Sequence, residues 1–367
     1  MIATLPPETH GGDVHRIARE FGIPKNALLD FSASINPRGL PPRAAERLAR
    51  EAIDPNLLAQ YPDPEAREMR QLLGKQLGVP HEAIVVGDGA GALIDACVRA
   101  LKPRKCLIPV PAFYEYERTC RVNNCFVHPF PLAAENGFTL DPAAISHAIR
   151  QNACDLLIVN NPHNPSGAGM DRAMMLYLLE LTRAAGAKVV IDEAFIDYAP
   201  GSEITADAVL LSGVVAVRSL TKFYGCPALR VAYLVAAPDI ARLIAAQVPV
   251  WPVTTLALNT LAEALKDTAY SRLSIEENEL ERIRLSRSLA ELGFQVFPSV
   301  SNFLLLHLPE NRCSAQLRER LIVKHNIVVR NCDSFAALAK GRYIRVAVKS
   351  ERDNNRLLEA ISKCLVP

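Results

Sequence analysis

The chain has 367 residues, and 50% of them are hydrophobic, so it is long enough for a large core and for two domains. Its 41 basic and 39 acidic side chains nearly cancel, which leaves no electrostatic drive for binding nucleic acid. No apolar run reaches membrane-spanning length, and residues 1–10 lack the basic start and apolar stretch of a secretory signal. We therefore expect a soluble, cytoplasmic protein with no membrane partner. Its nine scattered cysteines form no C-x-x-C pair, so we expect reduced thiols and no metal site.

The first 40 residues are rich in glycine and proline and are expected to be mostly loop. From about Arg43 onward, short apolar runs alternate with helical patterns such as residues 174–185. Continuous apolar strands separated by helices are typical of a parallel sheet covered on both faces. The strand-like runs are residues 83–86, 156–159, 188–191 and 214–217.

The C-terminal third has a different pattern of expected helices and strands. Residues 256–292 are expected to form one long helix that ends at Gly293, followed by strands at 303–306 and 344–348 and a helix at 315–324. We predict an α/β protein with two domains. The large domain, with a mostly parallel sheet, spans 43–255; a smaller α+β domain spans 256–367 and includes the N-terminal arm, 1–42.

Ligands of open parallel sheets bind beyond the carboxyl ends of the strands, so the residues that follow each strand are site candidates. The glycine-rich stretch 87–91 precedes a helix, where backbone N–H groups can surround an anion, although a plain turn uses the same residues. The stretch 160–167 contains two Asn-Pro pairs, which hold an amide side chain in a fixed turn.

Two further strand ends carry ionisable side chains. Asp192 follows a buried strand, where a carboxylate needs a cation such as a protonated pyridine nitrogen, although Asp also caps helices. Lys222 lies among Ser219, Thr221 and Arg230, which suits an amine tethered to a carbonyl cofactor whose phosphate binds the other three. Four such motifs in this order indicate one cofactor site.

These motifs resemble the class I/II aminotransferase superfamily, the fold type I pyridoxal-phosphate enzymes, along nearly the whole chain. The resemblance implies pyridoxal 5′-phosphate bound by Lys222 as a Schiff base, with Asp192 on the ring nitrogen. It also implies a homodimer with shared active sites, in which Tyr61 reaches the partner's cofactor phosphate. The other implied contacts are phosphate-binding backbone at Ala90 and Gly91, ring stacking by Phe113, a ring-hydroxyl contact from Asn164, and a substrate carboxylate contact from Arg345.

Two branches of the superfamily compete. His10-Gly11-Gly12, residues 29–37 and Phe195, where the other branch has Tyr, resemble the threonine-phosphate decarboxylases of cobamide biosynthesis. The other branch is the histidinol-phosphate aminotransferases. The chain departs from the decarboxylase pattern in having alanine at two usual glycine positions, Ala228 and Ala232, and Pro252 after Trp251. Phosphoserine and phosphonoalanine therefore stay open as substrates.

The substrate's phosphate needs a cationic clamp. Arg330, which follows an apolar strand, matches an arginine that contacts substrate phosphate in a relative; His10, Asn36 and Arg16 are further candidates from the N-terminal arm. We expect decarboxylation of a phosphorylated amino acid, with transamination as the alternative outcome because small differences in carboxylate orientation decide between them. A non-catalytic sensor on the same fold is a third alternative, and the intact Lys222 argues against it.

Overall fold

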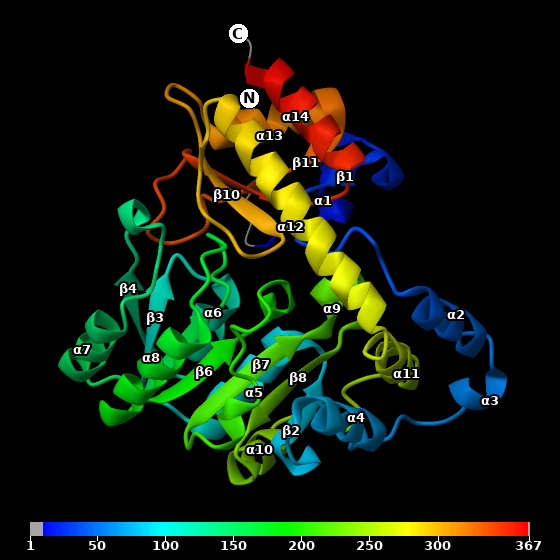
Figure 1. The fold of residues 1–367 in the computed structure, drawn as a ribbon, viewed down its shortest axis with the longest axis vertical. Coiled ribbons are helices and arrows are strands. Elements are labelled where there is room, and N and C mark those ends of the chain that lie inside the picture. Colours follow the sequence, from blue (N-terminus) through cyan, green and yellow to red (C-terminus); the bar gives the residue numbers. More distant parts are fainter. Residues whose placement is uncertain (1–9, 366–367) are drawn as a thin grey trace.

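The computed structural model describes residues 10–365; residues 1–9, expected to carry no signal, lie outside the described part. Two units lie one above the other, and helix α12 runs from the lower unit into the upper one (Figure 1). The lower unit contains a seven-stranded sheet, and the upper unit contains smaller sheets together with the first and last helices, α1 and α14.

The large sheet has the strand order β2-β8-β7-β6-β5-β3-β4. Strand β8 is antiparallel to both neighbours and all other pairs are parallel, so the prediction of a mostly parallel sheet is confirmed. As a result, β2, β5, β6 and β7 all end at the same edge. The strands are β2 (Ile84–Gly87), β3 (Lys105–Val110), β4 (Phe126–Pro131), β5 (Leu156–Asn160), β6 (Lys188–Asp192), β7 (Val214–Ser219) and β8 (Ala232–Ala236).

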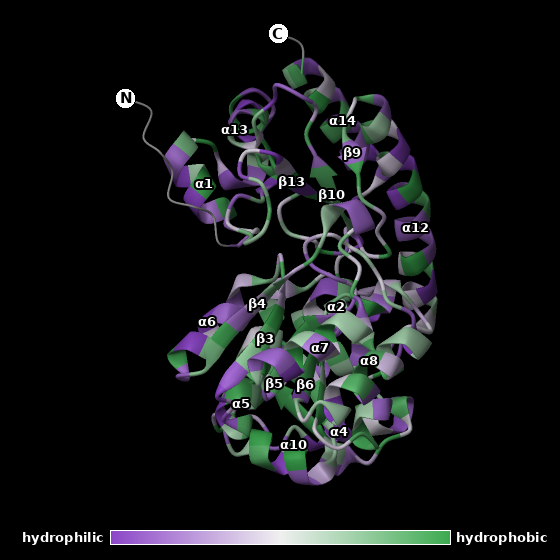
Figure 2. Cartoon of the chain, turned by 90° about the vertical axis from the view of Figure 1, so that its left-hand side faces the viewer, coloured by the Kyte–Doolittle hydropathy of each residue, from purple (hydrophilic) through white to green (hydrophobic). Residues whose placement is uncertain are grey.

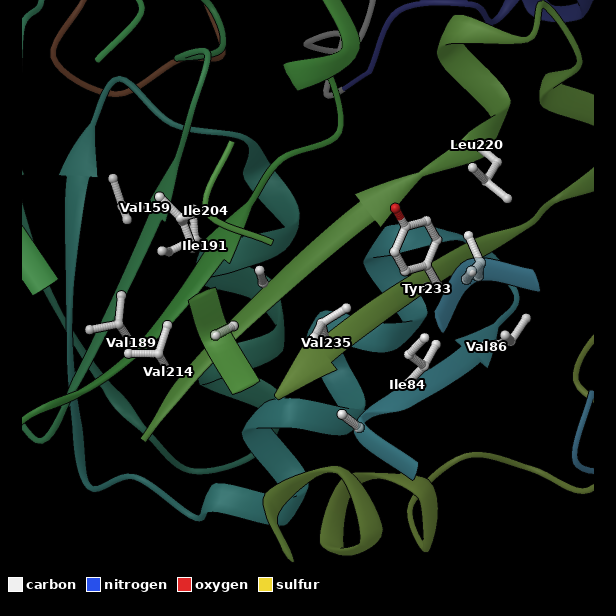
Figure 3. Packing of buried hydrophobic residues seen from close by; sticks show 14 of the residues in the cluster. Ile84, Val86, Val159, Val189, Ile191, Ile204, Val214, Leu220, Tyr233 and Val235 are labelled. Atoms are coloured by element: carbon white, nitrogen blue, oxygen red, sulfur yellow. The ribbon is translucent and has the colours of Figure 1, made fainter. Parts of the chain in front are cut away.

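Both faces of this sheet are buried, because successive side chains of a strand point to opposite faces. Val189 and Ile191 belong to one hydrophobic cluster, whereas Val190 belongs to the other. Figure 3 shows Val189, Ile191, Val214 and Val235 of neighbouring strands in the first cluster. That cluster also contains residues of α4 (Arg67–Leu77), α7 (Pro142–Asn152), α8 (Arg172–Ala184) and α11 (Thr255–Ala264); the second contains residues of α5 (Gly89–Leu101), α6 (Tyr114–Val122) and α10 (Pro238–Ala245).

The upper unit is built on a four-stranded antiparallel sheet and a parallel two-stranded pair. The N-terminal arm joins it, because β1 pairs with β11 and Ile17 of α1 packs against Ile322 and Val328. Figure 2 shows α1, α13 and α14 in the upper unit, above the lower sheet and its helices. The strands are β1 (Leu29–Asp30), β9 (Gln295–Val296), β10 (Phe303–His307), β11 (Ile327–Val328), β12 (Arg330–Asn331) and β13 (Tyr343–Ala347).

The helices of the upper unit and the remaining short helices complete the fold. They are α1 (Val14–Phe21), α12 (Thr268–Glu291), α13 (Ser314–His325) and α14 (Glu351–Leu365), with α2 (Pro42–Glu51), α3 (Pro55–Leu58) and α9 (Leu220–Phe223) near the lower sheet. No helix in the described part of the chain has the length and apolar character needed to cross a membrane. All nine cysteines are free thiols, and eight are buried.

Two details differ from the sequence expectation. Residues 256–292 do not form one helix: α11 ends at Ala264 and α12 starts at Thr268, because the Asp267 carboxylate accepts a hydrogen bond from Tyr270 N and caps the new helix. The loop-rich arm also contains α1, which Asp13 caps by accepting from Arg16 N. In addition, the lower core includes Ala257 and Leu261 of α11 and Tyr270 of α12, so α11 and the start of α12 pack with the large sheet rather than with the smaller unit.

Candidate active site

A cavity of about 620 Å³ lies at the carboxyl edge of the large sheet and extends to the upper unit. It is lined by residues that follow β2, β5, β6 and β7, by Phe113, and by residues of the N-terminal arm and of β12 and β13. All but three of the predicted site residues line it: His10, Ala90, Gly91, Phe113, Asn164, Asp192, Ser219, Thr221, Lys222, Arg230, Arg330 and Arg345.

Lys222 lies in the short helix α9 that follows β7. Burial lowers the pKa of its amine to about 8, because the charged form loses hydration. The positive charges of Arg345 and Arg230 lower this pKa further, and Asp192 opposes them. A larger share of the amine is therefore unprotonated near neutral pH than for an ordinary lysine, as a nucleophile requires.

Asp192 is the last residue of β6 and lines the same cavity as Lys222. Its Oδ1 accepts a hydrogen bond from Ala194 N at 2.9 Å, and its Oδ2 accepts one from the Tyr116 hydroxyl at 2.6 Å. Burial raises the pKa of Asp192, while these two hydrogen bonds and the nearby Lys222 lower it. The structure thus brings together the amine and the carboxylate on which the cofactor prediction depends.

An anion-binding cradle faces the cavity at the start of α5. The side chain of its N-cap residue, Asp88, makes no capping hydrogen bond, so it leaves the first-turn N–H groups to other acceptors. Gly89 has φ +81°, and a Cβ there would lie 2.4 Å from Nη2 of Arg230, which covers the turn. The Ser219 and Thr221 hydroxyls are hydrogen-bonded to each other at 2.9 Å, which leaves one O–H of the pair to donate into this cavity. The cradle suits a phosphate group.

Phe113, at the N-cap of α6, supplies an aromatic wall of the cavity, and its ring makes an edge contact with Tyr116 at 5.6 Å between centroids. Asn164 lines the cavity and accepts a hydrogen bond from Nη1 of Arg345 through its Oδ1. An amine, a buried carboxylate, an aromatic face, an amide and an anion cradle in one cavity fit a phosphorylated pyridine aldehyde.

Arg345 and Arg330 supply two cationic groups from the upper unit. Nη2 of Arg345 donates to Ser32 O at 3.1 Å, and its buried Nε has no hydrogen-bond partner in the described part of the chain. Nη2 of Arg330 donates to the Ser334 hydroxyl at 2.7 Å, and the guanidinium lies 5.3 Å from the ring centroid of Phe335. The unsatisfied Nε indicates that an acceptor from a ligand belongs beside it.

Three predicted residues lie elsewhere. Asn36 is buried and donates to Phe223 O at 2.8 Å and to the Ser274 hydroxyl at 2.9 Å, and it lines a different cavity between the units. Arg16 pairs with Asp13 and Glu20 on α1. Tyr61 is 78% exposed and stacks on Trp251 at 4.3 Å, outside the cavity.

His10 does reach the cavity, and its Nε2 lies 3.1 Å from Oε1 of Glu115, with its ring 5.5 Å from that of Phe113. The arm therefore contacts α6 across the mouth of the site.

The sequence reading missed two residues of the site. Ser34 lines the cavity, and its buried hydroxyl has no hydrogen-bond partner in the described part of the chain. The Tyr116 hydroxyl donates a hydrogen bond to Oδ2 of Asp192. The alternation of Ser32, Ser34 and Asn36 was a visible signal, but only the backbone path shows which of these side chains faces the cavity.

The chain is similar to known proteins both in sequence and in structure. The sequence profile of aminotransferase class I and II matches residues 26–361. The threonine-phosphate decarboxylase of Salmonella typhimurium is 33% identical over 360 residues, which is 97% of this chain and 96% of the relative.

Two solved structures are similar over most of the chain. The histidinol-phosphate aminotransferase of Clostridium acetobutylicum has a TM-score of 0.84 at 30% identity and covers 92% of this chain and 98% of its own. The L-threonine-O-3-phosphate decarboxylase of Porphyromonas gingivalis has a TM-score of 0.81 at 27% identity, with 92% and 99% covered. Both branches expected from the sequence are therefore represented among similar proteins.

Proposed function

Because the chain belongs to the class I and II aminotransferase family and so uses pyridoxal 5′-phosphate, we propose that it decarboxylates a phosphorylated amino acid. The preferred substrate is L-threonine O-3-phosphate, which would lose CO₂ and gain one proton to give (R)-1-amino-2-propanol O-2-phosphate in cobamide biosynthesis. The similarity to two threonine-phosphate decarboxylases supports this choice.

The observation that carries the proposal is the presence of two buried arginines in the cavity that holds Lys222. Arg345 and Arg330 are only 7% and 1% exposed. The buried Nε of Arg345 has no hydrogen-bond partner in the described part of the chain, so an acceptor from a ligand belongs beside it. A substrate with both a carboxylate and a phosphate offers an anionic group to each guanidinium. Arg345 would bind the carboxylate through its Nε edge, and Arg330 would bind the phosphate.

The unsatisfied hydroxyl of Ser34 lines the same cavity and can donate to an anionic oxygen of the substrate. His10, now paired with Glu115, offers a further donor at the mouth of the site. We assign Ser34, rather than the inward-bonded Asn36, to the substrate contacts of the N-terminal arm.

Each remaining residue has a task in the reaction. Lys222 would hold the cofactor aldehyde, and its amine would be the group that delivers a proton to the substrate Cα. When bound, the cofactor would supply an electron-withdrawing ring that takes up the electron pair of the broken bond. Asp192 would pair with the ring nitrogen, and the first-turn N–H groups of the Gly89–Gly91 cradle would hold the phosphate. Arg345 fixes the carboxylate direction and thereby decides which bond at Cα breaks.

Phe195 favours decarboxylation over the histidinol-phosphate reaction. Its ring lines the cavity and packs edge-on against Phe303 at 5.0 Å, so the wall carries no hydroxyl at this position. A tyrosine there would donate to the cofactor's ring oxygen and change the proton balance at Lys222.

A homodimer is the proposed assembly. Tyr61 stacks on Trp251, and exposed apolar side chains occur in the sequence before each of them: Ile53, Leu58 and Val250, at 81%, 56% and 66% exposure. In the proposed dimer these side chains are covered and Tyr61 contacts the cofactor phosphate of the partner subunit.

The proposal is tested by incubating the purified holoenzyme separately with threonine phosphate, phosphoserine, phosphonoalanine and histidinol phosphate. CO₂ release and the requirement for 2-oxoglutarate are measured for each, with unphosphorylated threonine as the control for the phosphate contact. We expect CO₂ from threonine phosphate without any keto acid. Amino transfer from histidinol phosphate to 2-oxoglutarate, with no CO₂ from the other compounds, would refute it. No turnover of any of the four compounds would favour a sensor.

A further inference from the structure

Tyr116 is a buried side chain with a direct link to the proposed chemistry. It lies on α6, is 1% exposed, and donates its hydroxyl proton to Oδ2 of Asp192 at 2.6 Å. Its ring meets Phe113 at 5.6 Å and an interplanar angle of 80°. One residue therefore contacts both the carboxylate and the aromatic wall of the cofactor cavity.

Two donors from different parts of the chain fix Asp192. Ala194 N holds Oδ1 and comes from the turn directly after β6, whereas the Tyr116 hydroxyl holds Oδ2 and comes from α6. A carboxylate held at both oxygens cannot rotate freely, so its direction toward the cavity is set before any ligand binds.

We propose that Tyr116 is a positioning residue that keeps Asp192 ionised against the ring nitrogen of the bound cofactor. This inference rests on the proposed pairing of Asp192 with that nitrogen. The proton in such a pair can lie on either partner, and only the ion pair leaves the ring positively charged and able to withdraw electrons.

The electrostatics of the cavity agree with this role. Burial raises the pKa of Asp192 and so favours its neutral form, and the hydrogen bond from Tyr116 is the largest of the effects that lower this pKa. A hydroxyl that donates to a carboxylate stabilises the anion, and bonds of this charge-assisted type are short and strong. Without the phenol, the proton would move from the ring nitrogen toward the carboxylate.

A buried tyrosine needs an acceptor in any case, so the test must separate a role in charge from a role in packing. Tyr116→Phe keeps the ring and removes only the hydroxyl. The readout is the ¹⁵N NMR signal of holoenzyme loaded with ring-¹⁵N pyridoxal phosphate, which reports protonation of the ring nitrogen without any substrate. Asp192→Asn gives the reference for a nitrogen without its carboxylate, and Tyr177→Phe on α8, 48% exposed, is the matched control.

We expect the Tyr116→Phe signal to move toward that of Asp192→Asn, with the Tyr177→Phe signal unchanged. On the substrate that is turned over, kcat should fall about tenfold while KM changes little, because no substrate contact is removed. Replacement of Tyr116 by 3-fluorotyrosine, a stronger donor of similar size, should move the signal in the opposite direction and provides a second test if Tyr116→Phe folds poorly.

The outcomes separate this inference from its premise. If Asp192→Asn itself leaves the nitrogen signal unchanged, the pairing of Asp192 with the ring is refuted and the role of Tyr116 falls with it. If Asp192→Asn moves the signal but neither change at Tyr116 does, the pairing stands and the positioning role is overturned.

Discussion

Arg330 and Arg345 lie directly opposite each other on the antiparallel strands β12 and β13, and both side chains line the cavity. Directly opposed residues point to the same face, and like charges in such a pair repel. Burial lowers the pKa of Arg345 to about 10; the nearby charge of Arg330 lowers it too, while Cys332 and Asp30 raise it. An anionic substrate beside the two guanidinium groups would reduce the repulsion between them.

Arg330→Met should relieve this repulsion and weaken substrate binding. We expect KM for threonine phosphate to rise by about two orders of magnitude, because a charge-assisted contact to phosphate is lost. Cofactor absorbance should be unchanged. Steady-state kinetics check this, with Arg352→Met on the exposed start of α14 as control. An unaltered KM in Arg330→Met would remove Arg330 from the substrate site.

Ser34→Ala and Asn36→Ala should separate binding from stability. Ser34 has a buried hydroxyl without a hydrogen-bond partner in the described part of the chain, so its loss should leave unfolding unchanged and raise KM about tenfold. Asn36 holds Phe223 O and Ser274, so its loss should lower the free energy of unfolding by about 1–3 kcal/mol with KM nearly unchanged. Denaturant unfolding and kinetics on both variants test the assignment, and the reverse pattern would restore Asn36 as the substrate residue.

The pH dependence of cofactor attachment follows from Lys222. Half of the Lys222 amine is free at its pKa of about 8, and nearly all of it is free about one pH unit higher. An ordinary lysine, with a pKa of about 10.4, would keep gaining free amine beyond pH 10. The rate of reconstitution of cofactor-free protein, followed by absorbance, should therefore level off above about pH 9. A rate that climbs steadily to pH 10 would show that the amine is not perturbed.

Phe195→Tyr should change the chromophore formed at Lys222. A phenol at this position would donate to the cofactor's ring oxygen and reduce the ability of that oxygen to stabilise a proton on the bound nitrogen. The pH midpoint of the visible absorbance change should therefore fall, by about one unit. Spectrophotometric titration measures it, and Phe195→Leu, which adds no hydroxyl, is the control. Equal midpoints in the tyrosine and leucine variants would contradict the geometry proposed for Phe195.

Much of the site was predictable because its chemistry follows strand ends. Asp192 directly follows the apolar run 188–191, Lys222 lies five residues after the run 214–217, and parallel strands bring such positions to one edge. Tyr116 could not be found in this way, since α6 carries two tyrosines and only the packing of the helix shows that this one faces Asp192.

Two features of the fold could not be predicted from the apolar pattern of the sequence. The apolar periodicity of residues 256–292 predicts one continuous helix. A new helix starts after Asp267 instead, because the Asp267 carboxylate accepts a hydrogen bond from Tyr270 N and caps it. Strand β8 reverses direction within the sheet, and its apolar residues carry no signal for strand direction.

The fate of the substrate carboxylate is the most direct test of the proposed decarboxylation. Threonine phosphate carrying ¹³C in its carboxyl group is incubated with holoenzyme and no keto acid, and the label is followed by NMR. We expect the label to appear as bicarbonate at the rate of substrate loss, and we expect the Lys222→Ala variant to release no labelled bicarbonate. Label that stays in a keto acid, formed only when 2-oxoglutarate is added, would contradict decarboxylation and identify an aminotransferase.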